Sequence, residues 1–307
     1  MSKKYFIITV DTEGDNLWDY KKGDQITTHN TKYIPRFQEL CEKYGFKPVY
    51  LTNYEMLCDD AFVEYAIAKE QQGLCEIGLH LHAWNNPPLY ELDAKYTGNP
   101  YLIEYPDDIM RAKFEYLYNL FCEKIGHKPY SHRAGRWAMD ERYFRLLEEF
   151  DIKVDCSVTP RLDWSNVNGE LGGGPDYRTS PSIPHWIGSV LEMPFTVKPS
   201  RALLGNSLKQ NIKTLLRGRN LQLRPAVYSL KEMKYVVDKY NSDKSVDYLE
   251  FMLHSSELMP GGSPYFIDDN AINTLYWSIQ SLFEYAKQNG YKGITLLDYY
   301  SCYNEHC

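Results

Sequence analysis

The sequence lacks the features of a membrane-spanning, secreted or nucleic-acid-binding protein. It contains no run of about 18 apolar residues, and no apolar leader with a small-residue cleavage site precedes its first predicted strand. Its seven cysteines include no Cys-x-x-Cys pair, so we expect reduced thiols rather than a zinc knuckle. The net charge of −7 argues against nucleic acid as the main partner. Together these absences predict a cytoplasmic protein.

Strand-like and helix-like segments alternate along most of the chain. The predicted strands are residues 5–11, 48–52, 75–80, 130–134, 152–156, 190–193, 247–254 and 293–297. The predicted helices are residues 31–44, 60–72, 107–125, 140–150, 230–240 and 268–289. This alternation favours an α/β fold of parallel strands covered by helices, and the lack of repeats or low-complexity linkers favours a single domain over residues 1–307.

Polar residues recur where the predicted strands end. In a parallel α/β barrel the carboxyl ends of all strands open onto one face, where catalytic groups collect. The recurrence therefore favours a barrel-like closure over an open sheet. The residues concerned are Asp11, Glu13, His80, His82, Arg133, Asp155, His254 and Asp298.

Two histidines mark the end of the predicted strand 75–80. His80 and His82 are separated by one residue, so alternation along an extended chain places both rings on one side. Imidazoles aimed at one point are typical of zinc and iron(II) sites, and we interpret the pair as metal ligands. The alternative interpretation is a pair of hydrogen-bonded core histidines.

Two acids follow the first predicted strand with the same spacing. Asp11 and Glu13 lie on one side of the chain, so one can bind a metal while the other stays free as a base. The spacing leaves open which acid has which role. The alternative is a solvated pair of loop carboxylates.

Two further segments carry residues suited to catalysis. Arg133 leaves a predicted strand beside small residues and can keep a neighbouring carboxylate ionised, and Trp137 offers a flat face to a sugar ring. The alternatives are a surface arginine and a core tryptophan. His254 is suited to donate a proton near neutral pH, while Glu257 either sets its tautomer or caps the following turn.

A basic segment interrupts this otherwise acidic chain. Residues 198–224 contain seven Lys and Arg and no acid, and their apolar residues recur at helical spacing. We interpret the segment as a basic amphipathic helix, suited to an anionic membrane surface or a diphosphate group. The alternative is a helix packed on the barrel with a solvated basic face. If the segment binds a membrane, the inner face of the membrane is a second expected location of the protein.

An ordered set of motifs resembles the NodB-homology polysaccharide deacetylases, carbohydrate esterase family four, and most closely their surface-glycan and lipopolysaccharide branch. The resemblance extends from about residue 5 to residue 300. The motifs are Thr9-Val-Asp11-Thr-Glu13, Glu76-Ile-Gly-Leu-His80-Leu-His82, His132-Arg133-Ala-Gly135, Val154-Asp155-Cys-Ser157 and Met252-Leu-His254-Ser-Ser-Glu257-Leu. It implies a distorted (β/α)7 barrel, a divalent metal and hydrolysis of an N-acetyl group.

The resemblance also implies a role for each residue. Glu13, His80 and His82 hold the metal, which is Zn2+ or alternatively Fe2+, Co2+ or Ni2+. Asp11, oriented by Arg133, is the base and His254 the acid. We assign substrate contacts to Trp84, Trp137, Asp155 and Glu257.

This chain departs from the family pattern at two motifs. The usual Asp-Asp pair is replaced by Asp11-Thr12-Glu13, and the usual His-x-x-x-His is shortened to His80-x-His82. Trp84 stands where the second histidine normally lies. Every required chemical type is still present.

The expected substrate is an N-acetyl or N-formyl sugar, carried on a lipid or a nucleotide, in surface-polysaccharide biosynthesis. One alternative is hydrolysis of a small non-sugar amide or cyclic amidine on the same fold. Another is a catalytically inactive glycan-binding protein.

Overall fold

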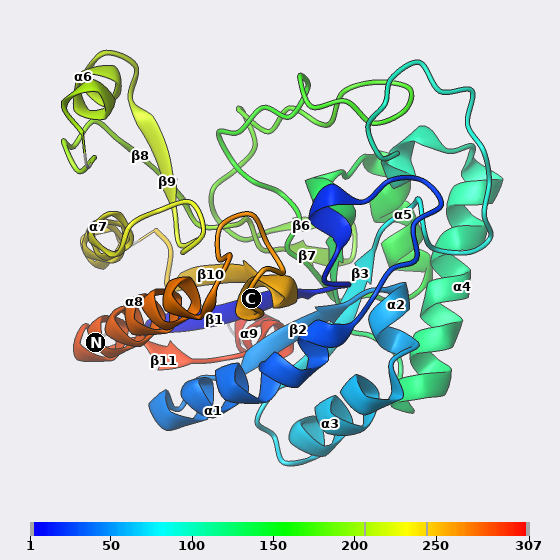
Figure 1. The fold of residues 1–307 in the computed structure, drawn as a ribbon, viewed down its shortest axis with the longest axis horizontal. Helices are drawn as coiled ribbons and strands as arrows, with labels where there is room; N and C mark the ends of the chain where they lie inside the picture. Colours follow the sequence, from blue (N-terminus) through cyan, green and yellow to red (C-terminus); the bar gives the residue numbers. More distant parts are fainter. Residues whose placement is uncertain (1–2, 206, 244, 305–307) are drawn as a thin grey trace.

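A computed structural model describes residues 3–205, 207–243 and 245–304 of the chain. Its centre is a curled nine-stranded sheet, which forms a half-barrel (Figure 1). Seven of its strands run parallel in the spatial order β10-β1-β2-β3-β4-β5-β7. They are β1 (Tyr5–Thr12), β2 (Pro48–Thr52), β3 (Glu76–Leu81), β4 (Ser131–Ala134), β5 (Val154–Asp155), β7 (Val190–Glu192) and β10 (Tyr248–His254). The predicted α/β fold with a distorted barrel is confirmed.

Two short strands complete the sheet. β6 (His185–Ile187) pairs antiparallel with β7, and β11 (Lys292–Gly293) pairs parallel with β1. Residues 293–297 were expected to form the last strand, and this is wrong beyond Gly293. The side chain of Thr295 accepts a hydrogen bond from the Asp298 amide at 3.1 Å, and a helix begins at Leu296 instead.

Helices flank the sheet, and all but the last cover its outer face (Figure 1). They are α1 (Ile34–Tyr44), α2 (Tyr54–Leu57), α3 (Asp60–Gln71), α4 (Asp107–Ile125), α5 (Glu141–Glu149), α7 (Leu230–Asn241), α8 (Asp269–Gln288) and α9 (Leu296–Asn304). The short 3-10 turns are η1 (Leu17–Asp19), η2 (His29–Tyr33), η3 (Leu102–Glu104), η4 (Gly135–Trp137) and η5 (Ser255–Leu258). Among the described residues, no helix is both long and apolar enough to cross a membrane.

The alternation of side chains along β1 decides which residues reach the barrel interior. Phe6, Ile8 and Val10 belong to the large core that includes residues of α1 and α8. Tyr5 and Ile7 belong to a smaller core on the opposite side of the sheet, together with residues of α9. Since successive residues of a strand point to opposite faces, Thr9 and Asp11 lie on this inner side.

A seam separates the two outer parallel strands, β7 and β10, and loop residues close it. The Tyr248 hydroxyl donates to the Pro194 carbonyl at 2.5 Å, and the Glu250 amide donates to Oγ1 of Thr196 at 2.8 Å. The Met252 amide donates to the Leu223 carbonyl at 3.1 Å. The seam is therefore filled by irregular backbone, which is why the barrel is distorted.

The basic segment leaves the barrel next to this seam. β8 (Val197–Ser200) and β9 (Arg219–Gln222) form an antiparallel pair, and α6 (Leu208–Arg217) lies at its far end (Figure 1). The helix predicted within residues 198–224 is thus confined to α6, because the flanking residues pair as strands. Leu204, one of the apolar residues whose spacing indicated the longer helix, precedes α6.

Candidate active site

Five of the predicted polar strand-end residues, Asp11, Glu13, His80, His82 and His254, line one cavity of about 270 Å³ at the carboxyl ends of β1, β3, β4 and β10. Parallel strands bring their carboxyl ends to one edge, so residues up to 243 positions apart in the sequence become neighbours, as with Asp11 and His254. The cavity is lined by Asp11, Glu13, Leu17, Trp18, His80, His82, Trp84, Asn99, Ala134, Arg136, Trp137 and His254.

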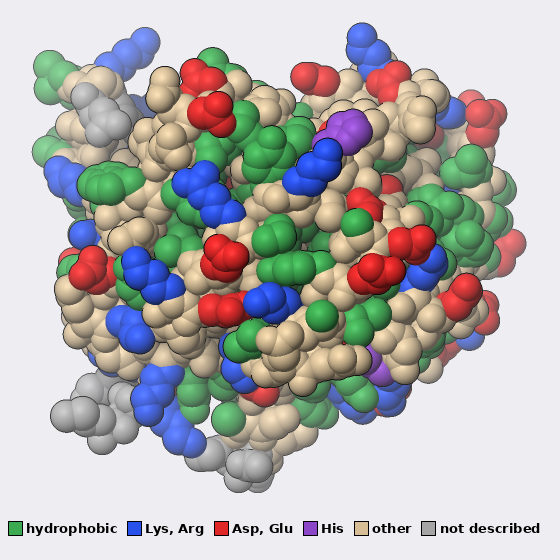
Figure 2. Space-filling view, turned by 60° about the horizontal axis from the view of Figure 1, so that its bottom comes forward, with side chains coloured by type: hydrophobic (Ala, Val, Ile, Leu, Met, Phe, Trp, Pro, Cys, Tyr) green, Lys and Arg blue, Asp and Glu red, His purple; other side chains and the backbone are tan. Residues whose placement is uncertain are grey.

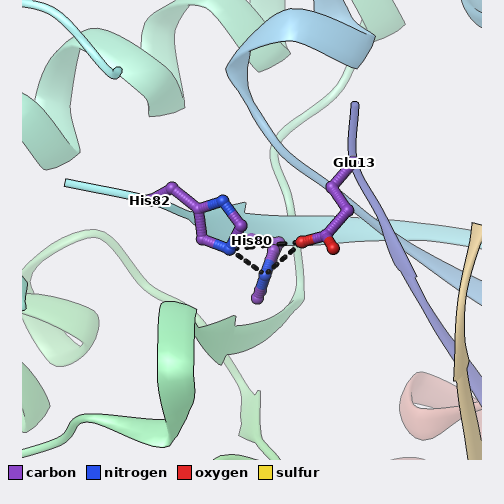
Figure 3. Close-up of side chains that lie close together, drawn as sticks. All are labelled: Glu13, His80 and His82. Atoms are coloured by element: carbon purple, nitrogen blue, oxygen red, sulfur yellow. Dashed lines mark hydrogen bonds and ion pairs between the residues drawn. The ribbon is translucent and has the colours of Figure 1, made fainter. Parts of the chain in front are cut away.

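Three buried side chains converge as a metal donor set (Figure 3). Glu13 Oε2 lies 3.3 Å from His82 Nε2 and 3.8 Å from His80 Nε2, and the two Nε2 atoms are 3.0 Å apart. Tetrahedral zinc with ligands at about 2.0–2.1 Å separates its donors by about 3.3 Å. The observed separations bracket that value, so these residues fit a small divalent ion.

The surroundings hold these donors in the orientation that a metal requires. Nδ1 of His80 donates to the carbonyl of Arg133 at 2.9 Å, which leaves the Nε2 lone pair directed at the cluster. Ser255 Oγ accepts from the Glu13 amide at 3.0 Å, and Asn30 donates to the Glu13 carbonyl at 2.8 Å. The ring of Trp84 stacks on that of His82 with centroids 4.3 Å apart.

The pKa values of the two histidines shift in opposite directions. Burial and the positive charge of His80 lower the pKa of His82 well below its usual value. Burial opposes protonation of His80 as well, yet the carboxylates of Asp11 and Glu13 raise its pKa. A neutral His82 is the form in which imidazole binds a metal.

Asp11 belongs to a buried ionic network centred on Arg133. The guanidinium donates to Asp11 Oδ1 at 2.6 Å and to Oγ1 of Thr9 at 2.8 Å, and it also pairs with Glu250. Burial alone would raise the pKa of Asp11, but the positive charge of Arg133 outweighs it and lowers the pKa. Burial dominates at Glu250 and raises its pKa to about 7. Asp11 is therefore held as a carboxylate with one oxygen, Oδ2, free of the arginine.

His254 faces Asp11 and the metal donors from β10. Its Nε2 lies 3.9 Å from Asp11 Oδ2 and 4.0 Å from Glu13 Oε1. On the other side, Nδ1 lies 3.3 Å from Glu257 Oε1, whose second oxygen accepts from the His254 amide at 3.1 Å. Burial lowers the pKa of His254, and the carboxylates of Glu13 and Glu257 more than offset this and raise it. Glu257 thus both caps the turn and contacts the ring.

Two of the four residues assigned to substrate contacts do not reach the cavity. Trp84 and Trp137 line it, whereas Asp155 and Glu257 are fully buried. Asp155 accepts from His132 Nδ1 at 2.7 Å and from the Ser157 hydroxyl at 2.8 Å. In this structure the carboxylates of Asp155 and Glu257 make internal hydrogen bonds and do not line the cavity.

The structure adds lining residues that the motifs did not indicate. Trp18 lies in η1 with its ring edge-on to His254, centroids 5.0 Å apart, and its Nε1 donates to Ser256 Oγ at 3.0 Å.

Arg136 and Trp137 have φ of 56° and 63°, a left-handed conformation that non-glycine residues rarely adopt. Such backbone strain is concentrated at functional sites.

Comparison with known proteins identifies the fold. No family model and no curated protein matches the chain. Among solved structures, a candidate glycoside hydrolase/deacetylase from Parabacteroides distasonis aligns with TM-score 0.67 and 12% identity over 99% of this chain and 72% of that one. A candidate polysaccharide deacetylase from Mycobacterium smegmatis aligns with TM-score 0.50 and 14% identity, covering 95% and 94%. Puue allantoinase aligns with TM-score 0.56 and 14% identity, covering 98% and 89%.

These identities are low, and the alignments establish a shared fold. The chain has the fold of the NodB-homology carbohydrate deacetylases, as its motifs predicted.

Proposed function

We propose that this protein is a metal-dependent hydrolase that removes the N-acetyl, or alternatively the N-formyl, group of a sugar. The observation that supports this is the convergence of three kinds of group on one cavity. A Glu-His-His donor set, an arginine-held carboxylate and a carboxylate-paired histidine all line it or reach it. Amide hydrolysis needs a polarised carbonyl, a base for the water and an acid for the amine, and each has a candidate here.

Glu13, His80 and His82 would hold the metal. Two imidazoles and one carboxylate form a donor set used by catalytic zinc, and the same set also suits iron(II). Zinc is therefore our first candidate, with Fe2+, Co2+ and Ni2+ as alternatives. When bound, the ion would polarise the amide carbonyl and acidify a water molecule.

Asp11 and His254 supply the proton transfers. Asp11 accepts a proton from the attacking water through Oδ2, the oxygen that Arg133 leaves free. A carboxylate with a lowered pKa is a weak base, so this transfer depends on an acidified water. His254 then donates its proton to the nitrogen as the C–N bond breaks, which gives the free amine and the carboxylic acid. Each group of this kind typically contributes roughly 10²–10⁴ in rate.

The walls of the cavity favour a sugar as the carrier of the amide. Trp18, Trp84 and Trp137 line the site together with the polar groups of Asn99 and Arg136. Aromatic faces with a few polar groups suit a sugar ring, which has apolar faces and hydroxyl edges. The motifs' resemblance to the surface-glycan branch supports a lipid- or nucleotide-linked precursor, modified in the cytoplasm, as the substrate.

Acetate release from N-acetylated sugars, with metal analysis of each sample, tests the proposal. We expect His80→Ala to lose bound metal and activity, and His254→Ala to keep metal while kcat falls by roughly 10²–10⁴. His185→Ala is the matched control, since His185 does not line the cavity and its ring Nδ1 bonds the nearby Ile183 carbonyl at 3.0 Å. Full activity and full metal content in both active-site variants would contradict the proposal.

A second candidate is hydrolysis of a small cyclic amide. The cavity of about 270 Å³ is near the lower end of ligand pockets, and an allantoinase shares the fold. Including allantoin in the same assay separates the two functions. Sugar binding without turnover of any substrate would instead support the inactive glycan-binding alternative.

A further inference from the structure

Residues 197–222, which we call the basic arm, project from the barrel and play no part in the cavity described above. The arm consists of β8, α6, β9 and their connections (Figure 1). α6 carries four apolar side chains that are more than half exposed: Leu208 at 77%, Ile212 at 51%, Leu215 at 56% and Leu216 at 72%. Such a concentration of exposed leucine and isoleucine on one short helix marks a surface that meets a partner.

The residues of α6 are sorted around its axis. At about 100° per residue the four apolar positions fall within an arc of about 100°, and Lys209, Lys213 and Arg217 occupy the adjoining arc of about 80°. The helix rests on a third face. There Thr214 is only 3% exposed, and the Asn211 side chain bonds the Gly205 backbone at 2.8 and 3.2 Å. Packing within the arm therefore leaves both the apolar and the basic arcs outward.

The charge of the arm contrasts with that of the rest of the surface. Figure 2 shows acidic and basic side chains intermingled over one face of the molecule. Residues 198–224 contain no Asp or Glu, although the whole chain has a net charge of −7. Within the described part of the chain, only two cations of this segment form ion pairs, Lys198 with Asp243 and Arg219 with Glu232. Of the remaining cations, Arg201, Lys209, Lys213 and Arg217 are exposed and available to an external anion, whereas Arg224 is half-buried and its Nε is buried.

A basic cleft lies at the base of α6. It has a volume of about 370 Å³ and is lined by Arg201, Arg217 and Arg219 together with Pro199, Ser200, Gly218 and Asn220. Arg219 is paired with Glu232, and the guanidinium groups of Arg201 and Arg217, together with the Ser200 hydroxyl, are suited to bind a phosphate group. The cleft adjoins the end of the basic arc at Arg217, so one anionic surface can engage both.

We propose that the basic arm docks on the surface of an anionic phospholipid bilayer. The apolar arc of α6 enters the boundary between headgroups and acyl chains, the lysines lie at headgroup level, and the arginine cleft takes a lipid phosphate. An exposed apolar arc flanked by cations is the pattern of helices that lie in a membrane interface. The absence of acids over 27 residues provides charge complementarity to such a surface. This inference is independent of the proposed reaction.

Co-sedimentation of the full chain with vesicles tests the docking. We expect binding to phosphatidylglycerol–phosphatidylcholine vesicles at low salt and little binding to pure phosphatidylcholine. Lys209→Ser/Lys213→Ser should weaken binding roughly 30-fold, because each cation near an anionic leaflet contributes about 1 kcal/mol. Leu208→Ser/Leu216→Ser should weaken it on the order of tenfold or more. Ile267→Ser is the matched control, since Ile267 is 71% exposed outside the arm.

Two results would overturn the docking proposal. One is equal or absent binding to the two kinds of vesicle. The other is a dimer in size-exclusion chromatography that the double leucine variant converts to monomer, since a second copy would then cover the apolar arc. Acetate release from a soluble sugar, measured on the same samples, keeps the two proposals apart. A sample that releases acetate but does not bind vesicles contradicts the docking proposal alone. A sample that binds vesicles but releases no acetate contradicts the deacetylase proposal alone.

Discussion

Replacing Arg133 with methionine tests how the buried ionic network holds Asp11, the proposed catalytic base. The substitution keeps much of the side-chain length and removes the guanidinium that contacts Asp11, Thr9 and Glu250. Both carboxylates are buried, at 4% exposure for Asp11 and 0% for Glu250, so solvent cannot replace the lost charge. Removing one partner of a buried ion pair typically destabilises a protein by about 3–5 kcal/mol.

Two effects moderate this loss. The pKa of Glu250 is already raised to about 7, so without Arg133 it becomes protonated at neutral pH and avoids a buried charge. Asp11 does not start from a raised pKa: its pKa is lowered, and Arg133 is the main cause of the lowering. We therefore expect a loss of about 3 kcal/mol in the free energy of unfolding, near the lower end of that range. Acetate release should fall at least roughly 10²-fold, because Asp11 loses its fixed orientation.

Urea denaturation followed by tryptophan fluorescence measures the stability, and the double variant Arg133→Met/Glu250→Gln provides the control. The second substitution removes the other carboxylate that needed the arginine, so it should restore part of the lost stability. Activity should stay low, because Asp11 is still unsupported. An unchanged free energy of unfolding in the single variant, or a double variant less stable than the single one, would refute this account of the network.

Three further predictions follow from the same geometry. Because the pKa of His254 is raised and its protonated form is the acid, kcat should fall as pH rises through that pKa. Glu257→Gln should move this fall in kcat to lower pH. A pH profile that does not move would contradict the influence of Glu257 on His254. The raised pKa of Glu250 means that the folded state binds the proton of Glu250 more tightly than the unfolded state does, so the free energy of unfolding falls between about pH 4.5 and 7. Glu250→Gln should flatten this part of the profile of stability against pH. An unaltered slope would exclude Glu250 as its source. Chelation should abolish activity and lower the melting temperature, with zinc restoring both, and a melting temperature insensitive to chelator would contradict metal binding at His80.

The parallel strands and the common side of His80 and His82 were predictable because they follow simple periodicities. Continuous apolar runs mark strands buried on both faces, and β2 was predicted with its observed bounds. The spacing of His80 and His82 fixed their common side without any knowledge of the tertiary structure. Since all parallel strands end at one edge, the proximity of His254 to Asp11 also followed from topology.

Depth and loop conformation were not predictable in the same way. Asp155 ends β5 and Glu257 lies in η5, just after β10, but sequence position does not show whether a carboxylate faces the cavity or is hydrogen-bonded to buried partners. Trp18 reaches the site from a 3-10 turn, and turns carry no periodicity that places a side chain. Glu250 lies within an apolar strand, where a carboxylate paired with an arginine from another strand has no local signal. The helix within the basic segment was predicted too long because β8 and β9, at four residues each, are too short to show a clear alternation.

The closure of the seam between β7 and β10 has a consequence for the modularity of the chain. Val197 and Gln222 are paired neighbours, so the basic arm enters and leaves the barrel at one point. The contacts that close the seam come from Pro194, Thr196 and Leu223, outside the paired ends of the arm. The arm is therefore topologically a hairpin insertion, and a tight turn joining residues 197 and 222 would leave every sheet ladder of the barrel intact. Evolution or an engineer can exchange this element without redesigning the scaffold beneath it.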